Sequence, residues 1–140
     1  MAKMIPLASS KKTIYNGTHG NASVAIGGAS ITAEAGDSVK LAVLDVGVQL
    51  VNATVHNAAF GAGVKGTVYC VPKGEAVADK YKVTGEIDLS SSKATNSDDN
   101  GWFPTQLEDV KRDVIMVISG ANVTGKELKY RITTTSIGNL

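Results

Sequence analysis

The chain has 140 residues, a length that suits one domain and allows a hydrophobic core that needs no disulfide or metal to hold it. Lys and Arg number 14 against 13 Asp and Glu, and the basic residues are scattered, which argues against binding nucleic acid through a basic face. Cys70 is the single cysteine and has no internal disulfide partner, so we expect folding in a reducing cytoplasm. No apolar run is long enough for a membrane span or a signal peptide, and we expect neither nucleic acid nor a membrane as a partner.

Residues 1–20 are predicted to form an extended arm, and residues 21–140 to form the folded domain. The arm is polar, with Lys11-Lys12 at its centre and glycines near its end. Its apolar residues are Met4, Ile5, Leu7, Ile14 and Tyr15. Such a segment can become ordered across a partner and bury much area with few residues. The alternative is a frayed end without a role.

Beyond the arm, apolar residues alternate with polar ones at the period of two that is typical of half-buried strands. Gly27-Gly28 is predicted to separate a strand at 24–26 from one that begins at Ile31. Further strands are predicted at 39–43, 51–55, 67–71, 80–89, 114–118 and 128–132. The segment 114–118 is apolar on both faces and is predicted to be central in its sheet.

Turn residues separate these segments every 8–12 residues, as in sandwiches and jelly rolls. The predicted breaks include residues 61–66, 72–74 and Thr124-Gly125. A short helical turn at 105–110 is the only helix expected. We therefore predict an all-β fold: a single β-sandwich or jelly-roll-like domain of about eight short strands with an extended N-terminal arm.

A polar loop at 90–100 ends at Trp102 and Phe103. The simpler interpretation is that these two aromatic residues cap the core at one end of the sandwich. The alternative is that they anchor a contact with another protein, because aromatic residues are enriched in interface hot spots.

The motifs that resemble sites for catalysis or cofactor binding lack the sequence context that such sites need. Residues 61–66 fit the spacing G-x-G-x-x-G, but a β-branched strand follows where a dinucleotide site needs a helix. Asn96–Gly101 resembles the first half of a calcium loop, but Leu107 stands where the bidentate Glu belongs. Cys70 lies within a predicted strand, where a buried and unreactive thiol is the usual outcome. We expect no metal, no cofactor and no enzymatic activity.

Two stretches, residues 36–56 and residues 113–131, together with the closing Ile137-Gly-Asn-Leu140, resemble small capsid decoration (cement) proteins of tailed bacteriophages. Members of that group are β-sandwich or jelly-roll domains. The resemblance implies a structural virion protein that is made in the cytoplasm of a bacterial host. It would bind the outer surface of the capsid and stabilise contacts between major capsid subunits.

The partner so implied is the major capsid protein, with further copies of this chain as a second possibility. Many identical copies on a lattice give avidity, so no single contact needs a deep pocket. The residues themselves, rather than the resemblance, suggest where the contact lies. The candidate contact residues are Met4, Ile5, Leu7, Lys11, Lys12, Ile14, Tyr15, Trp102 and Phe103.

Three other functions compete with this one. A carbohydrate-binding or adhesion module of a head fibre or tail would use Trp102 and Phe103 as a sugar platform, although only 5% of the residues are aromatic. A tail-tube or connector subunit would assemble into rings. An enzyme with an unrecognised site would carry a metal or cofactor when purified.

Overall fold

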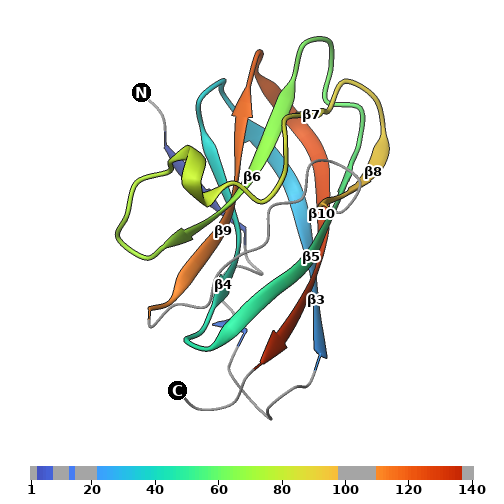
Figure 1. The fold of residues 1–140 in the computed structure, drawn as a ribbon. Helices are drawn as coiled ribbons and strands as arrows, with labels where there is room; N and C mark the ends of the chain where they lie inside the picture. The colour runs from blue at the N-terminus through green and yellow to red at the C-terminus, as the bar shows by residue number, and fades with distance from the viewer. Residues whose placement is uncertain (1–2, 8–12, 15–21, 98–109, 137–140) are drawn as a thin grey trace.

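The computed structural model describes residues 3–7, 13–14, 22–97 and 110–136 of the chain. In these ranges it consists almost entirely of strands arranged in two facing sheets (Figure 1), which confirms the predicted all-β sandwich. The strands are β1 (Met4–Pro6), β2 (Thr13–Ile14), β3 (Ala22–Ala33), β4 (Ser38–Leu44), β5 (Val48–Asn57), β6 (Lys65–Pro72), β7 (Ile87–Asp88), β8 (Lys93–Asn96), β9 (Arg112–Ser119) and β10 (Val123–Ser136).

The large sheet has the strand order β1-β4-β9-β6-β7, and β2 pairs with the other end of β4. Strand β9 lies in the middle of it, as its apolar sequence predicts. Its side chains are buried on both faces, since Val114, Ile115 and Met116 are all at most 2% exposed. The pairings β4–β9 and β9–β6 are antiparallel, whereas β1 and β2 run parallel to β4.

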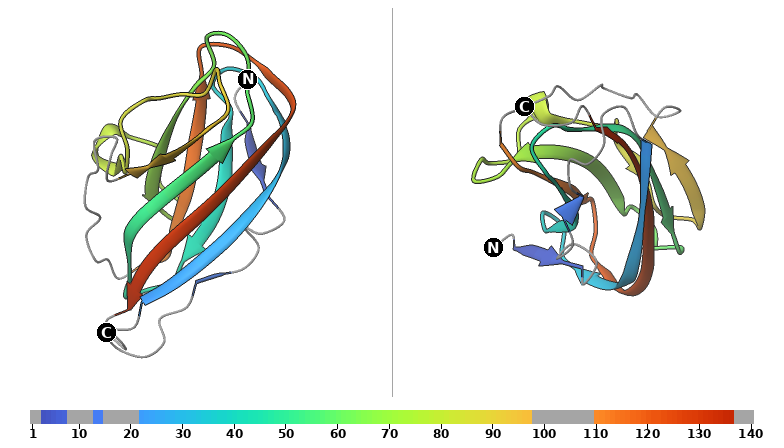
Figure 2. Two further views of the ribbon diagram at one scale, coloured as in Figure 1. Left: turned by 90° about the vertical axis from the view of Figure 1, so that its right-hand side faces the viewer. Right: turned by 90° about the horizontal axis from the view of Figure 1, so that it is seen from below.

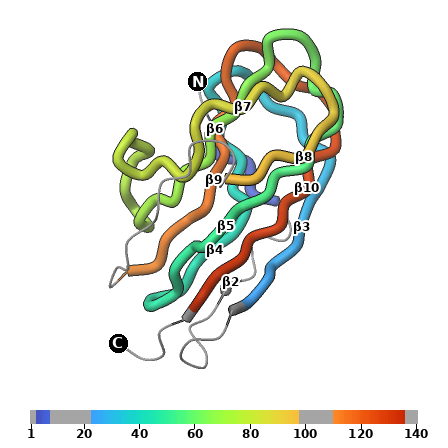
Figure 3. Tube along the Cα trace, turned by 45° about the vertical axis from the view of Figure 1, so that its right-hand side comes forward, coloured from blue at the N-terminus to red at the C-terminus, as the bar shows by residue number. Residues whose placement is uncertain are grey.

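The small sheet has the order β3-β10-β5-β8 and is antiparallel throughout. Its long strands lie side by side across one face of the molecule, with β3 at the edge (Figure 2, left; Figure 3). In β10, Leu128, Tyr130 and Ile132 are buried and Lys129 and Arg131 are exposed, which confirms the predicted alternation.

The core lies between the two sheets and draws side chains from both. The apolar faces of the two sheets must cover each other because neither can be left in water. The largest fully buried side chains include Leu41 and Leu44 of β4, Leu50 of β5, Met116 of β9 and Leu128 of β10.

Two predicted breaks at glycines are wrong. Strand β3 runs unbroken through Gly27-Gly28, because β10 lies so close that a Cβ at Gly28 would come within 2.7 Å of the Leu128 carbonyl oxygen. Strand β10 runs through Gly125, whose φ of +60° belongs to a register shift between Val123 and Lys126. Gly28 permits the close approach of β10, and Gly125 permits the register shift; neither glycine ends its strand.

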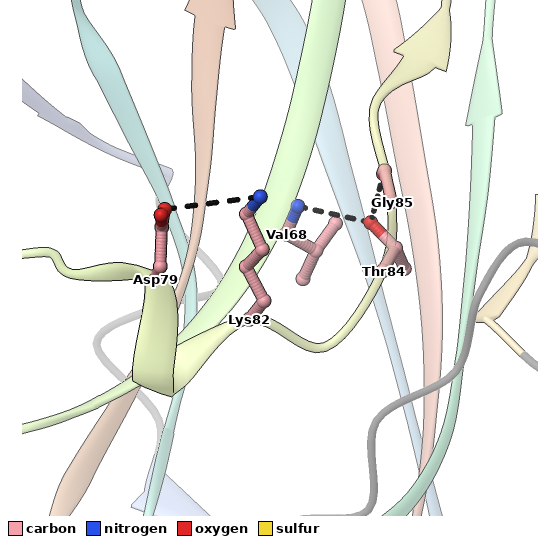
Figure 4. A network of polar contacts seen from close by, with 5 residues as sticks. All are labelled: Val68, Asp79, Lys82, Thr84 and Gly85. Carbon is pink, nitrogen blue, oxygen red and sulfur yellow. Dashed lines mark hydrogen bonds and ion pairs between the residues drawn. The ribbon is translucent and has the colours of Figure 1, made fainter.

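The predicted strand at 80–89 is also largely wrong. Residues 79–81 form a 3₁₀ turn, and strand pairing is confined to β7 and one bridge between Tyr69 and Lys82. The Thr84 side chain contributes to the contact between this segment and β6. Its hydroxyl accepts a hydrogen bond from the Val68 N–H at 3.2 Å and donates one to the Gly85 carbonyl at 2.8 Å (Figure 4). Four apolar residues share one face in the predicted alternation: Val83, Ile87 and Leu89 are buried, whereas Tyr81 is only partly buried.

The described parts of the predicted arm differ from the prediction, because they belong to the large sheet. Strand β1 pairs with Ser38–Lys40 and β2 pairs with Val43–Leu44. The Asp37 carboxylate fixes the start of β1: it accepts the Lys3 N–H at 3.0 Å and the Glu34 N–H at 3.0 Å. Strand β1 has only three residues, too few to form a stable strand by itself, but the existing edge of β4 supplies its hydrogen-bond partners.

Two further predictions concern segments 90–100 and 105–110. The first was predicted to be a loop, yet it contains β8, which pairs with the far edge of β5. The predicted helical turn at 105–110 lies outside the described residues except for Val110.

Candidate interaction surface

Side chains that could bind a metal or act as a nucleophile are spread over the described part of the chain. In it, no three His, Cys, Asp or Glu side chains are grouped so that they could hold a metal ion. Cys70 is buried in β6 of the large sheet, whereas His56 is exposed on β5 of the small sheet, so the two do not form a nucleophile pair. In the same ranges, no helix is long and apolar enough to span a membrane.

The outer face of β3 exposes two large apolar side chains. Ile26 is 75% exposed and Val24 is 58% exposed, the two highest values among the large apolar side chains described. Exposure alternates along the strand, so that Gly28, Ser30 and Thr32 share the outer face with them. We call these five positions the β3 surface. Single exposed apolar residues are common on proteins, but two adjacent positions on one strand face form a patch.

Strand β3 is also an open sheet edge. It pairs with β10 on one side, and no described strand pairs with it on the other. Proteins usually protect such edges with short strands, proline or charge. The other edge strands follow this pattern: β7 and β8 are short, and β1 is short and ends at Pro6. By contrast, β3 has 12 residues and contains neither a charged residue nor proline.

An open groove of about 660 Å³ crosses the middle of this strand. Its lining includes Ile26 and Gly28 of β3 and, from the neighbouring strand β10, Glu127 and Lys129. The Lys129 side chain lies close over Gly28, since a Cβ at Gly28 would come within 2.8 Å of the Lys129 Cγ. Glu127 and Lys129 form its far wall and are joined by an ion pair of 3.1 Å. This exposed ion pair contributes little to stability, but it holds the Glu127 and Lys129 side chains beside the groove.

A second, smaller hollow of about 290 Å³ lies further along the same face. His56, Ser92 and Lys93 line it, together with Glu127 and Lys129. Both hollows are shallow and open to solvent. A surface of this shape is suited to contact with another macromolecule, whereas sites for small molecules are usually enclosed.

The structure places three of the predicted contact residues in very different surroundings. Met4 is 46% exposed on β1 and is free to contact a partner. Ile5 packs partly against the core. Leu7 is 3% exposed and belongs to the core of its own domain, so in this conformation it offers almost no surface to a partner.

The remaining predicted contact residues are not brought together by the described structure. Ile14 lies in β2, where its backbone pairs with Leu44. The other predicted residues lie outside the described ranges; they are Lys11, Lys12, Tyr15, Trp102 and Phe103.

The β3 surface was missed by sequence reasoning. The signal was present, because residues 22–33 form an uncharged run in a chain that is 19% charged. The glycine pair in its middle led to the prediction of two separate pieces. An uncharged strand can equally be buried, and only the sheet order shows that this one is an edge.

Two carboxylates have shifted pKa values. The backbone N–H of Glu34, and then that of Lys3, hold the pKa of Asp37 below its ordinary value of 3.8. Hydrogen bonding from the Ser90 N–H likewise lowers the pKa of Asp88. In both cases the ionised carboxylate accepts the bonds, so these are fixed anionic caps of turns.

Comparisons with known proteins extend the structural finding. No protein-family model and no curated protein matches the sequence. Among solved structures, a chain of the capsid of Ralstonia phage GP4 is similar, with a TM-score of 0.69 at 14% identity over 98% of this chain and 99% of that one. A chain of the cyanophage Pam1 capsid asymmetric unit is similar with a TM-score of 0.54 at 16% identity, over 86% of this chain and 88% of that one.

These likenesses concern the fold. The two-sheet sandwich, aligned over nearly its whole length, occurs as a complete chain in the first of these capsids. At such low identity no residue of those chains can be matched in role to a residue here, and fold alone does not establish function.

Proposed function

We propose that this chain is a structural protein of a bacteriophage virion, which binds the outer surface of the assembled capsid and stabilises contacts between major capsid subunits. The observation that carries the proposal is the similarity to the Ralstonia phage GP4 capsid chain over 99% of that chain's length. A capsid component thus exists that consists of one such sandwich and little else.

The described surface suits this role. It presents an open apolar edge and two shallow hollows that are open to solvent. Proteins that occupy a repeating lattice gain avidity from many weak contacts, so flat surfaces suffice. The net charge of +1 also allows many copies to lie close together without strong repulsion.

The residues proposed for the capsid contact are those predicted from the sequence, with Leu7 excluded because it is buried in its own core. Met4 is the described residue that best fits, since it is exposed at the edge of the large sheet. Trp102 and Phe103 remain proposed anchors.

The proposal is tested by mixing the purified chain with expanded, undecorated shells of its phage and measuring co-sedimentation. We expect saturable binding at a fixed number of copies per capsid subunit. Met4→Glu and Trp102→Ala should each weaken binding at least about tenfold if they remove a contact worth about 1.4 kcal/mol. Val77→Glu, at another exposed apolar position, is the control and should bind normally.

Point substitutions are preferable to deletion of residues 1–20. That deletion would remove β1, β2 and the buried Leu7, so a loss of binding could simply reflect a damaged domain. Absence of binding to every form of the shell would contradict the proposed function.

A further inference from the structure

We infer that two copies of this chain associate through their β3 strands, antiparallel and about a two-fold axis at Gly27, which joins their small sheets into one continuous sheet. The inference is independent of the proposed capsid role, because it concerns the purified chain alone. It starts from the open, uncharged edge described above.

The absence of charged residues on β3 suits it to pairing with a second copy of itself. In a two-fold interface each surface meets itself, so any charge on the strand meets a like charge nearby. Strand β3 has none over its 12 residues. The alternate N–H and C=O groups that point away from β10 can therefore pair with a second β3 without a penalty from like charges.

The two-fold symmetry limits the register of the two strands. Antiparallel strands related by a two-fold axis must place outward residues opposite outward residues, which requires the axis to pass through a residue and not between two. With Gly27 on the axis, Ile26 of one copy lies opposite Gly28 of the other. The ladder then covers residues 22 to 32 of both copies, nearly the whole strand.

In the register with Gly27 on the axis, large side chains lie opposite small ones. Ile26, the most exposed of the large apolar residues described, would lie beside the bare backbone of Gly28 in the groove of its partner, next to the flexible Lys129 side chain. Every other large residue also meets a small one. The pairs are Val24 with Ser30, Ala25 with Ala29, Ser23 with Ile31, and Ala22 with Thr32.

Neighbouring registers fit less well. With the axis at Ile26, the two Ile26 side chains would lie opposite each other and only residues 22 to 30 would pair. With the axis at Gly28, residues 23 to 33 would pair, but Ile26 would lie opposite Ser30 and Val24 opposite Thr32, so each would meet a larger residue than in the Gly27 register. The axis at Gly27 is thus favoured by side-chain size.

The first test measures the mass of the full chain by analytical ultracentrifugation over a range of concentrations. We expect a reversible dimer whose dissociation constant rises at least about tenfold in Ile26→Lys, since that change places two like charges in the interface. Val77→Lys, a matched substitution of an exposed valine on the loop after β6, should dimerise like the unmodified chain. A chain that stays monomeric at all concentrations, or a dimer that Ile26→Lys leaves intact, would overturn the inference.

The second test measures the register by disulfide trapping. In Ala25→Cys/Ala29→Cys the two introduced thiols lie opposite each other across the axis, and mild oxidation should give a covalent dimer. The native Cys70 is buried and should not interfere. In Ser23→Cys/Ala29→Cys the thiols would face each other only if the axis were at residue 26, so we expect little covalent dimer. The reverse pattern would overturn the proposed register.

Discussion

Asp37 links the edge of the large sheet to the turn after β3. Its two carboxylate oxygens accept backbone N–H groups of Lys3 and Glu34, and the Ser38 N–H donates to the Lys3 carbonyl at 2.9 Å. A protonated Asp37 carboxyl group has lost part of this capacity to accept hydrogen bonds. The native state therefore favours the ionised carboxylate, which lowers the pKa of Asp37.

We therefore expect Asp37 to make stability depend on pH in the acid range. The folded pKa lies below the ordinary 3.8, so its stabilising effect is complete above about pH 5 and is lost as the pH falls through 3.8 toward the folded value. Asp37→Asn should lower the melting temperature at pH 7 and reduce its decline between pH 5 and 2. Asp88 contributes a similar decline in both proteins, so the difference between the two pH profiles isolates Asp37.

If the two proteins had parallel profiles of melting temperature against pH, Asp37 would not be the acid-sensitive cap described here. The sequence Gly36-Asp37 is typical of a turn, and the chain does turn there. The sequence could not show that the Asp37 carboxylate also accepts a hydrogen bond from the Lys3 N–H. Asp37 and Lys3 are far apart in the chain, and only the fold brings them together.

At the scale of elements, glycines mark both real turns and places where strands continue. Gly120 lies in the turn between β9 and β10 and has a φ of +84°. A Cβ there would lie 2.0 Å from the Gly63 carbonyl oxygen, in the loop before β6. Gly74, in the turn after β6, has a similar φ of +90° but open space around it.

This matched pair separates backbone strain from steric conflict. We expect Gly74→Ala to lower the free energy of unfolding by about 1 kcal/mol, the cost of a left-handed alanine. Gly120→Ala should cost about 3 kcal/mol or more, since the β9–β10 turn must also move away from the Gly63 carbonyl. Urea unfolding of both variants measures the difference, and equal losses would show that the turn yields freely.

The strands that could be predicted are those with strict alternation or continuous apolar sequence, such as β10 and β9. The errors come from tertiary context. Residues 80–86 alternate like a strand, yet Thr84 supplies side-chain bonds to Val68 in place of a ladder. Strand β8 has polar residues typical of a loop, and it becomes a strand because β5 offers it an open edge.

At the scale of the whole molecule, β3 is a long edge strand that pairs with β10 alone among the described strands, whereas the other described edge strands are short. This asymmetry was beyond sequence reasoning, because it depends on which strand ends up outermost. The fold class, by contrast, followed from period-two patterning and turn spacing alone. Its likeness to chains of two phage capsids gives the sandwich a structural precedent, while the contact residues still depend on the proposals above.

The central claim is that this domain is attached to the outside of a capsid, and the most direct measurement is a difference map between electron cryo-microscopy reconstructions of the expanded shell with and without the added chain. We expect extra density on the outer surface only, at junctions between major capsid subunits, into which the two-sheet domain fits as a rigid body. Difference density on the inner surface, or none on the shell, would contradict the claim.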